Sequence, residues 1–505
     1  MSLPEAVLEK HRTVAADAIP EDEYGHLIGG EWVASESGET TATTDATTGE
    51  ELARFQQGTR EDVDRAVAAA QAAFEGSWGE KTPQRRAELL HEIADELEAQ
   101  KTRIARLDSL EVGKPNKHSL FVDTTILIDQ FRHFASLART ADEGRVPPSG
   151  DDKLIHTRQE PYGVVGCISA WNFPAMFVAW KLGPALAAGN SVVYKPSSRA
   201  VLSTLEIAKI VDRVLPPGAL NVVTGAGGVV GDAITGHEAV GKVSLTGGTG
   251  AGQAAMRNAA EHIHPVSLEL GGKSPNIVFP DADLDEAVEG TLVSIFFNQG
   301  QQCTAGSRLF LHEDVRDEFM ARFAARVEEL TVGDPLSPLT DIGPMVDFDH
   351  QAAVQDHVET AKAAGASVLL EKPVPEKLAD APFVPPIVFG DVADDSQLSC
   401  DEVFGPVLAV FEFESTEEVV ERANDTEYGL AAGVWTSDLN TAHEVSRDLE
   451  AGMVWVNTYN DMFEPAPYGG YKQSGIGREL AVEAMEAYQQ TKTVKMSFGD
   501  IPNLG

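Results

Sequence analysis

The chain has 505 residues, of which 43% are hydrophobic, so it is long enough for a large core and two or three domains. Its 79 acidic and 39 basic residues give a formal net charge of −40. Nucleic acid and anionic membranes are therefore poor partners, because such a surface repels both.

The acidic residues are spread along the chain rather than gathered in a tail. This spread is typical of proteins adapted to high intracellular salt, as in halophilic archaea, although an acidic protein from an ordinary cell is the alternative. Three cysteines, Cys167, Cys303 and Cys400, are too few to cross-link so long a chain, which indicates a reducing compartment. Neither a signal peptide nor an apolar run of membrane length is visible, so we expect a cytoplasmic protein.

The first third of the chain predicts a hairpin followed by helices. Residues 1–24 are polar and acidic and carry no clear pattern, whereas two glycines between apolar runs predict a hairpin over 26–34. Apolar residues at helical spacing predict three helices, which begin near Thr59, Thr82 and Thr125. A capping box of Thr59 and Asp62 marks the first of these starts. All of these apolar faces are expected to belong to the core.

From Gly163 onward, strands alternate with helices, which favours a parallel, doubly wound sheet. The predicted strands cover 163–169, 191–195, 220–223, 242–245 and 276–279, and one predicted helix covers 202–214. Residues 272–472 repeat the alternation. The segment 154–161 reads as extended, and 488–496 reads as a strand without a nearby partner, a pattern frequent in strands that pair between subunits.

A glycine-rich segment, Thr246 to Gly252, follows a predicted strand and opens a helix. Backbone N–H groups at a helix N-terminus suit a pyrophosphate, although the spacing differs from the dinucleotide fingerprint and a simple glycine turn is the alternative. The Gly271–Ser274 segment resembles a P-loop, but the upstream position that should be glycine is Ser267, so we reject that interpretation.

Cys303 follows an apolar, aromatic segment and lies among small and amide residues. No second Cys or His stands at ligand spacing, so no metal site is predicted. A buried structural thiol is the simpler interpretation. The flanking glycine and amide groups instead favour a thiolate nucleophile.

Three further polar residues have two interpretations each. Asn172, at a strand-to-helix turn, could donate to an oxyanion or could cap the helix. Glu269 stands in an apolar run, where burial would raise its pKa toward that of a general base. Glu402 could bind ribose hydroxyls or could be an exposed loop acid.

Six segments together resemble motifs of the aldehyde dehydrogenase superfamily, in that family's order. They begin at Ala170, Tyr194, Leu268, Gly300, Glu402 and Pro467, and the similarity extends from His26 to Met496. The resemblance implies an α/β fold with two Rossmann-like domains and a small β oligomerisation arm, assembled as a homodimer or homotetramer. It places a nucleotide-binding domain at 1–142 and 162–271, a catalytic domain at 272–472, and the arm at 143–161 and 488–497.

The resemblance also implies a mechanism in which Cys303 attacks an aldehyde and forms a thioester after hydride transfer. Asn172 and the Cys303 N–H would stabilise the oxyanion, and Glu269 would activate the hydrolytic water. The family's proton relay matches Lys181 and Glu479. The implied cofactor-binding residues are Ile168, Trp171, Lys195, Ser198, Gly225, Gly231, Thr246, Gly247, Gly248, Gly252, Leu270, Glu402 and Phe404. The implied substrate channel consists of Phe173, Phe177, Trp180, Phe297 and Met462.

The cofactor is expected to be NADP or NAD, with NADP favoured. Ser198 stands where NAD-preferring relatives commonly carry a glutamate that repels a 2′-phosphate. A coenzyme-A-acylating relative is disfavoured because Glu269 is present, and a non-catalytic homologue because Cys303, Glu269 and Asn172 are all retained. The substrate stays open among a sugar-derived semialdehyde such as 2-oxoglutarate semialdehyde, succinate semialdehyde, betaine aldehyde and a simple aliphatic aldehyde.

Overall fold

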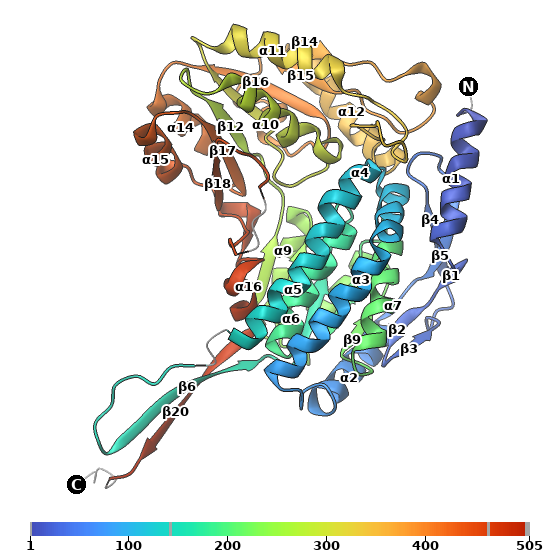
Figure 1. The fold of residues 1–505 in the computed structure, drawn as a ribbon, viewed down its shortest axis with the longest axis vertical. Coiled ribbons are helices and arrows are strands. Elements are labelled where there is room, and N and C mark those ends of the chain that lie inside the picture. Colours follow the sequence, from blue (N-terminus) through green and yellow to red (C-terminus); the bar gives the residue numbers. More distant parts are fainter. Residues whose placement is uncertain (1–2, 141–143, 462–464, 500–505) are drawn as a thin grey trace.

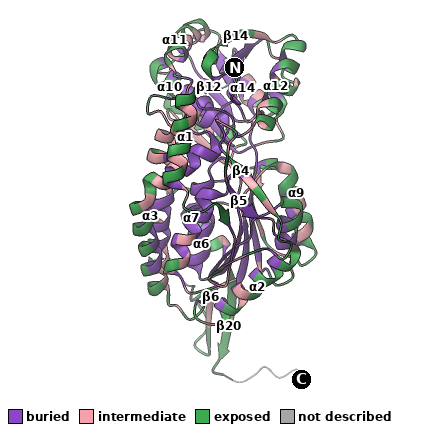
Figure 2. Ribbon diagram, turned by 90° about the vertical axis from the view of Figure 1, so that its right-hand side faces the viewer, coloured by how far each residue is buried: buried purple, intermediate pink, exposed green. Residues whose placement is uncertain are grey.

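The computed structural model describes residues 3–140, 144–461 and 465–499. Two α/β lobes lie one above the other in Figure 1, each built around a sheet of mainly parallel strands, and a two-stranded arm projects from the lower lobe. The sheet strands are largely buried and the outer helix faces exposed, as Figure 2 shows. The predicted α/β class is confirmed.

The lower lobe contains an eight-stranded sheet. Its strands, in spatial order, are β19 (Gly475–Ile476), β11 (Val266–Glu269), β10 (Lys242–Thr246), β7 (Val164–Ile168), β8 (Ser191–Lys195), β9 (Leu220–Val222), β2 (His26–Ile28) and β3 (Glu31–Val33). The five strands from β11 to β9 are parallel, whereas β19, β2 and β3 pair antiparallel. The predicted hairpin over 26–34 is therefore confirmed as β2–β3.

Helices pack on this sheet, and the four that the sequence predicts to begin near Thr59, Thr82, Thr125 and Leu202 begin within one residue of those positions. They are α2 (Arg60–Glu75), α3 (Pro83–Val112), α4 (Asn116–His118), η1 (Ser119–Asp123), α5 (Thr124–Thr140), α6 (Pro174–Ala188), α7 (Leu202–Val214), η2 (Gly227–Gly231), α8 (Asp232–Thr235) and α9 (Thr249–Ala260). The side chain of Thr82 accepts a hydrogen bond from the Arg85 N–H at the start of α3, which stabilises that end of the helix.

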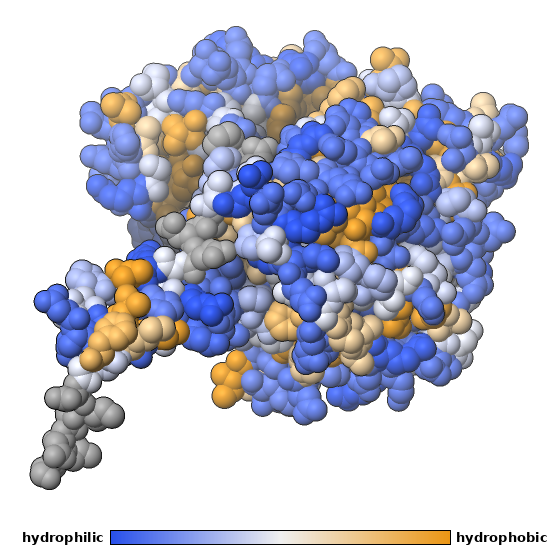
Figure 3. Space-filling model, turned by 60° about the horizontal axis from the view of Figure 1, so that its bottom comes forward, coloured by the Kyte–Doolittle hydropathy of each residue, from blue (hydrophilic) through white to orange (hydrophobic). Residues whose placement is uncertain are grey.

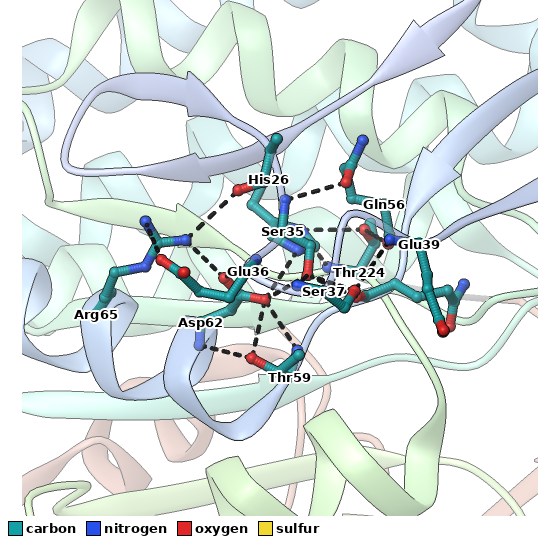
Figure 4. Close-up of polar contacts among 12 residues, drawn as sticks. His26, Ser35, Glu36, Ser37, Glu39, Gln56, Thr59, Asp62, Arg65 and Thr224 are labelled. Atoms are coloured by element: carbon teal, nitrogen blue, oxygen red, sulfur yellow. Dashed lines mark hydrogen bonds and ion pairs between the residues drawn. The ribbon is translucent and has the colours of Figure 1, made fainter.

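The start of α2 is fixed by the predicted capping box. The Thr59 side chain accepts from the Asp62 N–H, and the Asp62 carboxylate accepts from the Thr59 N–H at 2.9 Å. The same carboxylate also accepts from the Ser35 hydroxyl and from Arg65, each at 2.6 Å (Figure 4). Asp62 therefore ties the segment after the hairpin to α2.

The upper lobe contains a seven-stranded sheet, parallel except for its edge strand β14. In spatial order its strands are β14 (Ser367–Glu371), β15 (Ile387–Gly390), β16 (Val407–Phe413), β13 (Arg308–His312), β12 (Pro275–Val278), β17 (Ala431–Trp435) and β18 (Met453–Val456). The accompanying helices are α10 (Leu284–Phe296), η3 (Phe297–Gly300), α11 (Arg316–Glu329), α12 (Phe348–Ala363), η4 (Glu376–Leu378), α13 (Gln397–Cys400), α14 (Thr416–Asn424) and α15 (Leu439–Asp448). After β18 the chain returns to the lower lobe, where η5 (Lys472–Ser474) precedes β19 and α16 (Ala481–Ala487) packs against α5 and α6 (Figure 1).

The N-terminal segment, which carries no clear sequence pattern, forms helix α1 (Glu5–Ala18) beside a small sheet of β1 (Glu23–Tyr24), β5 (Glu51–Gln56) and β4 (Thr40–Thr44). The buried His11 holds this helix in place. Its Nδ1 lies 2.7 Å from Asp45 and its Nε2 3.0 Å from Asp334.

The projecting arm is an antiparallel pair of β6 (Lys153–Pro161) and β20 (Gln489–Ser497). The sequence pattern at 488–496 suggests pairing between subunits, but this strand finds its partner in the same chain, more than 300 positions away. Among the described residues, no helix is long and apolar enough to cross a membrane.

Candidate active site

Two cavities meet at Cys303. The larger, of about 500 Å³, lies at the carboxyl edge of the eight-stranded sheet, and the smaller, of about 140 Å³, lies beside α6. Cys303 and Phe177 line both cavities. The thiol therefore faces two spaces of different character, one wide and partly polar and one narrow and mainly apolar.

Strand register explains why the larger cavity forms where it does. Ile168 at the end of β7 is the partner of Lys195 at the end of β8, and Thr246 at the end of β10 is the partner of Glu269 at the end of β11. Parallel strands bring their carboxyl ends to one edge, where ligands bind in open α/β sheets.

Most of the predicted cofactor residues line this cavity, namely Ile168, Trp171, Lys195, Ser198, Thr246, Gly247, Gly248, Leu270, Glu402 and Phe404. Three glycines do not line it. Gly225 accepts a hydrogen bond from Ser198, a Cβ on Gly231 would face the side chains of Ile168 and Lys195, and a Cβ on Gly252 would lie 2.6 Å from Leu270. These three glycines contact residues that line the cavity but do not line it themselves.

Other lining residues were not predicted to contact the cofactor, although Ala170, Ser197 and Gly271 belong to the recognised motifs. They are Ser169, Ala170, Ser197, Arg199, Gly227, Leu245, Ala251, Gly271 and His350. Most are next in sequence to a predicted cofactor residue, and this proximity is the feature of the sequence that could have identified them. His350 is different, because it comes from α12 of the upper lobe and contacts the Trp171 and Phe404 rings.

The polar groups of the larger cavity suit a dinucleotide. Helix α9 begins there after Gly248, a residue with open space around its Cβ position, so the first N–H groups of the helix are accessible. The Thr246 hydroxyl is buried without a hydrogen-bond partner among the described residues. Burial lowers the pKa of Lys195 to about 8, and burial raises the pKa of Glu402 to about 7 despite its hydrogen bond from the Gly272 N–H.

The segment before Cys303 has an unusual backbone. Asn298, Gln299 and Gly300 all have positive φ, and a Cβ on Gly300 would lie 2.2 Å from the Gly405 carbonyl oxygen. Glycine is therefore required at 300, and the turn aims Cys303 into the cavities. Burial raises the pKa of Cys303 to about 12, which opposes the expectation that the thiol is held as a thiolate. A base must remove its proton before it can attack.

Glu269 lines the larger cavity together with Cys303. It is buried, and neither carboxylate oxygen has a hydrogen-bond partner among the described residues. Burial first, and the charge of Glu479 second, raise the pKa of Glu269 well above 4.5, as the sequence predicts. A structural role through pairing is not supported, since the carboxylate is unpaired.

Lys181 and Glu479 lie next to this carboxylate as a buried pair. Lys181 Nζ lies 2.5 Å from Glu479 Oε1 and 2.9 Å from Ser244 Oγ, and the Ser244 hydroxyl also donates to Glu479 at 3.1 Å. The two residues predicted as a relay are thus in contact, and Ser244 joins them.

Asn172 lies close to the nucleophile segment. Its amide donates to the Gln301 carbonyl at 3.0 Å, and its second amide hydrogen is free for another acceptor. The capping alternative is wrong, because α6 begins after Phe173 and no side chain caps it.

The smaller cavity holds the predicted channel residues Phe173, Phe177, Trp180 and Phe297, while Met462 lies outside the described residues. Missed lining residues are Val122, Ile126, Met176, Val293, Gln302, Thr304, Asn460 and Tyr468. Several come from η1, α5 and α10, whose apolar positions look like ordinary core in the sequence. The hydroxyl oxygen of Tyr468 lies 3.0 Å from Cys303 Sγ.

Comparison with known proteins agrees with this geometry. Residues 32–494 match the model of the aldehyde dehydrogenase family, and the chain belongs to that family. Solved structures to which the chain is similar include complexes with NAD+.

Three relatives illustrate the similarity. The chain is 42% identical over 475 residues to DhaS of Bacillus subtilis, an aldehyde dehydrogenase by name, covering 94% of this chain and 95% of that one. The NAD+ complex of an aldehyde dehydrogenase from Bacillus cereus is 41% identical with a TM-score of 0.93, covering 96% and 98%. A betaine aldehyde dehydrogenase from Staphylococcus aureus in complex with NAD+ is 36% identical with a TM-score of 0.94, covering 98% and 99%.

Proposed function

We propose that the enzyme oxidises an aldehyde to its carboxylic acid through a covalent adduct on Cys303. The observation that carries this proposal is the position of Cys303 at the meeting point of the two cavities, with Glu269 in the wall of the larger one. An aldehyde in the smaller cavity and a dinucleotide in the larger one would both reach the sulfur.

The chain's own groups have the following roles. Loss of the Cys303 proton to water frees the sulfur, which bonds to the carbonyl carbon, and the π electrons move to the oxygen. Asn172 and the Cys303 N–H donate to that oxyanion. The nicotinamide cofactor, when bound, supplies the hydride acceptor that allows a thioester to form. Glu269 then takes a proton from water, which attacks the thioester and releases the acid. Lys181 and Glu479 would carry that proton onward.

The walls of the smaller cavity favour an uncharged substrate. Its described lining is aromatic and aliphatic apart from short amide, hydroxyl and thiol groups, and it contains neither lysine nor arginine. A semialdehyde carboxylate would lack a cationic partner there, which is costly for a buried charge. Among the open alternatives, this supports a simple aliphatic or other uncharged aldehyde over the acidic semialdehydes. Betaine aldehyde, a cation, stays a second candidate because aromatic faces attract such groups.

A pair of cysteine variants tests this function. C303A should lose aldehyde oxidation by several orders of magnitude while binding nucleotide normally, because the covalent route is gone. C400A is the matched control and should keep full activity, since Cys400 is exposed on the upper lobe. Substantial turnover in C303A would overturn the assignment. Activity is measured as reduced-cofactor absorbance with a panel of aldehydes in molar KCl.

NADP is proposed as an accepted cofactor alongside NAD. The support is the absence of a carboxylate at Ser198, which removes the repulsion of a 2′-phosphate. The structure holds no dedicated phosphate site at this position, however, because the Ser198 hydroxyl donates to Gly225 at 2.8 Å and Arg199 pairs with Asp347 at 3.2 Å. A preference for NADP thus depends on these groups changing partners.

We also propose that the arm joins subunits and that the predicted domain limits hold. Leu154, Met496 and Phe498 are exposed on the β6–β20 arm, where Figure 3 shows hydrophobic surface. A homodimer or homotetramer would cover these side chains, and light scattering after size-exclusion chromatography measures the assembly.

A reducing, cytoplasmic location is supported by three cysteines that form no disulfide.

A further inference from the structure

The motif that begins at Pro467 is the one whose residues the mechanism above leaves without a role. It forms a loop that contacts both Cys303 and the Lys181–Glu479 pair. The Tyr468 N–H donates to the Glu479 carbonyl at 2.8 Å and the Glu479 N–H donates back to Tyr468 at 2.7 Å, so the loop is anchored beside the Lys181–Glu479 pair.

The Tyr468 ring is fixed from a second direction. It packs against Trp180 with 4.7 Å between ring centroids, and the residue is only 3% exposed. With the backbone and the ring both held, the direction of the hydroxyl is set by the fold. The hydroxyl lies 3.0 Å from Cys303 Sγ, and the sulfur is its one hydrogen-bond partner among the described residues.

A buried phenol needs a hydrogen-bond partner, and here that partner is the reacting atom. We propose that Tyr468 is a catalytic residue whose hydroxyl donates a hydrogen bond to the Cys303 sulfur and stabilises its ionised form. This deepens the proposed function, since it rests on Cys303 being the nucleophile.

The donor direction follows from the surroundings. Tyr468 lies near Glu269, and burial together with the neighbouring Cys303 and Glu269 charges raises its pKa well above 10. The phenol therefore keeps its proton while the thiol gives its proton to water. As the sulfur then bonds to the carbonyl carbon, its negative charge moves to the oxygen and the hydrogen bond from Tyr468 weakens. The tyrosine helps to form the nucleophile and transfers no proton itself.

The test measures the sulfur directly, without aldehyde or cofactor. Alkylation of Cys303 by iodoacetamide is followed from pH 7 to 9 by mass spectrometry of its peptide, with the exposed Cys400 of the same molecules as an internal reference. Y468F removes one oxygen atom and keeps the ring. A hydrogen bond to a charged group is worth about one to two pKa units. The more basic thiolate is also more nucleophilic, which offsets about half of this effect in the logarithm of the rate.

We expect Cys303 of Y468F to be alkylated about three- to tenfold more slowly than in the wild type, relative to Cys400, with a similar decrease in kcat/KM. Y24F is the matched control, because the buried Tyr24 hydroxyl donates to Glu206 at 2.7 Å and Tyr24 lines neither cavity. It should leave the Cys303 rate unchanged. If the ratio of the Cys303 alkylation rate to the Cys400 alkylation rate were the same in Y468F and the wild type, the proposal would be overturned, even if KM or stability changed.

A measurement on the unsubstituted sequence applies if Y468F does not fold. Enzyme produced with 3-fluorotyrosine carries more acidic phenols, which donate more strongly, so Cys303 should be alkylated faster relative to Cys400. No acceleration would contradict the proposal. Either negative result would leave the C303A test of the proposed function unaffected, because that test measures aldehyde turnover.

Discussion

The α-carbon of Gly469 lies directly against the carboxylate of Glu269. A Cβ on Gly469 would be 2.6 Å from Glu269 Oε1, and the glycine has a φ of +153°. Few side chains tolerate this backbone conformation, and none would leave Glu269 where it is.

G469A should therefore displace the carboxylate and reduce steady-state turnover about tenfold or more. G365A is the matched control, because Gly365 also has positive φ but has open space around it. It should lose some stability and keep its turnover. Equal turnover in the two variants would show that the activity of Glu269 does not depend on a glycine at position 469.

His11 links stability to pH. Burial lowers its pKa, but hydrogen bonds from the ring to Asp334 and Asp45 outweigh burial and raise the pKa to about 9. Because the folded-state pKa lies above the unfolded value of 6.5, this stabilisation is complete below pH 6.5 and is lost as pH rises through about 9. It amounts to a few kcal/mol at most.

Wild-type Tm should accordingly fall between pH 6.5 and 9, and H11Q should be less stable at pH 6.5 with a flatter profile. The exposed His443 offers a control, H443Q, whose profile should follow the wild type. A wild-type Tm that is constant over this interval would contradict the assignment of charge to His11.

Salt should stabilise the protein. The net charge of −40 produces self-repulsion, which added ions screen, so Tm should rise by several degrees from low to molar KCl. Differential scanning fluorimetry measures this. A Tm independent of KCl would remove the support for adaptation to high salt.

Cofactor choice should respond to Ser198. A glutamate there would face a 2′-phosphate without a partner, so S198E should shift relative efficiency toward NAD by about a hundredfold. The ratio of kcat/KM for NAD and NADP measures the shift. Strong rejection of NADP by the wild type would show that the missing carboxylate is not what governs selection.

Local sequence signals predict the elements of this fold well and their long-range contacts poorly. The capping box at Thr59, the start of α3 after Thr82 and the limits of α7 are all confirmed, because each depends on neighbouring residues. Helix α1 had no local signal, and it is held by His11 through residues far away in sequence.

The site shows the same division. The high pKa of Glu269 follows from its apolar neighbours, which the sequence displays. Burial of Cys303 by several elements raises the pKa of its thiol, against the expectation of a thiolate, and the local sequence does not display this burial. The contact of Tyr468 with Cys303 joins positions 165 apart and has no local pattern.

The central claim is that Cys303 carries the acyl group and Glu269 removes it. Stopped-flow measurement of reduced cofactor in E269Q tests both parts at once. We predict a burst of about one equivalent per site followed by a slow steady state, because the thioester forms but water is no longer activated. The steady state of the wild type should fall as pH drops through the raised pKa of Glu269, since only the deprotonated base is active, and E269Q should lack this dependence. Normal steady-state turnover in E269Q, without a burst, would contradict the account.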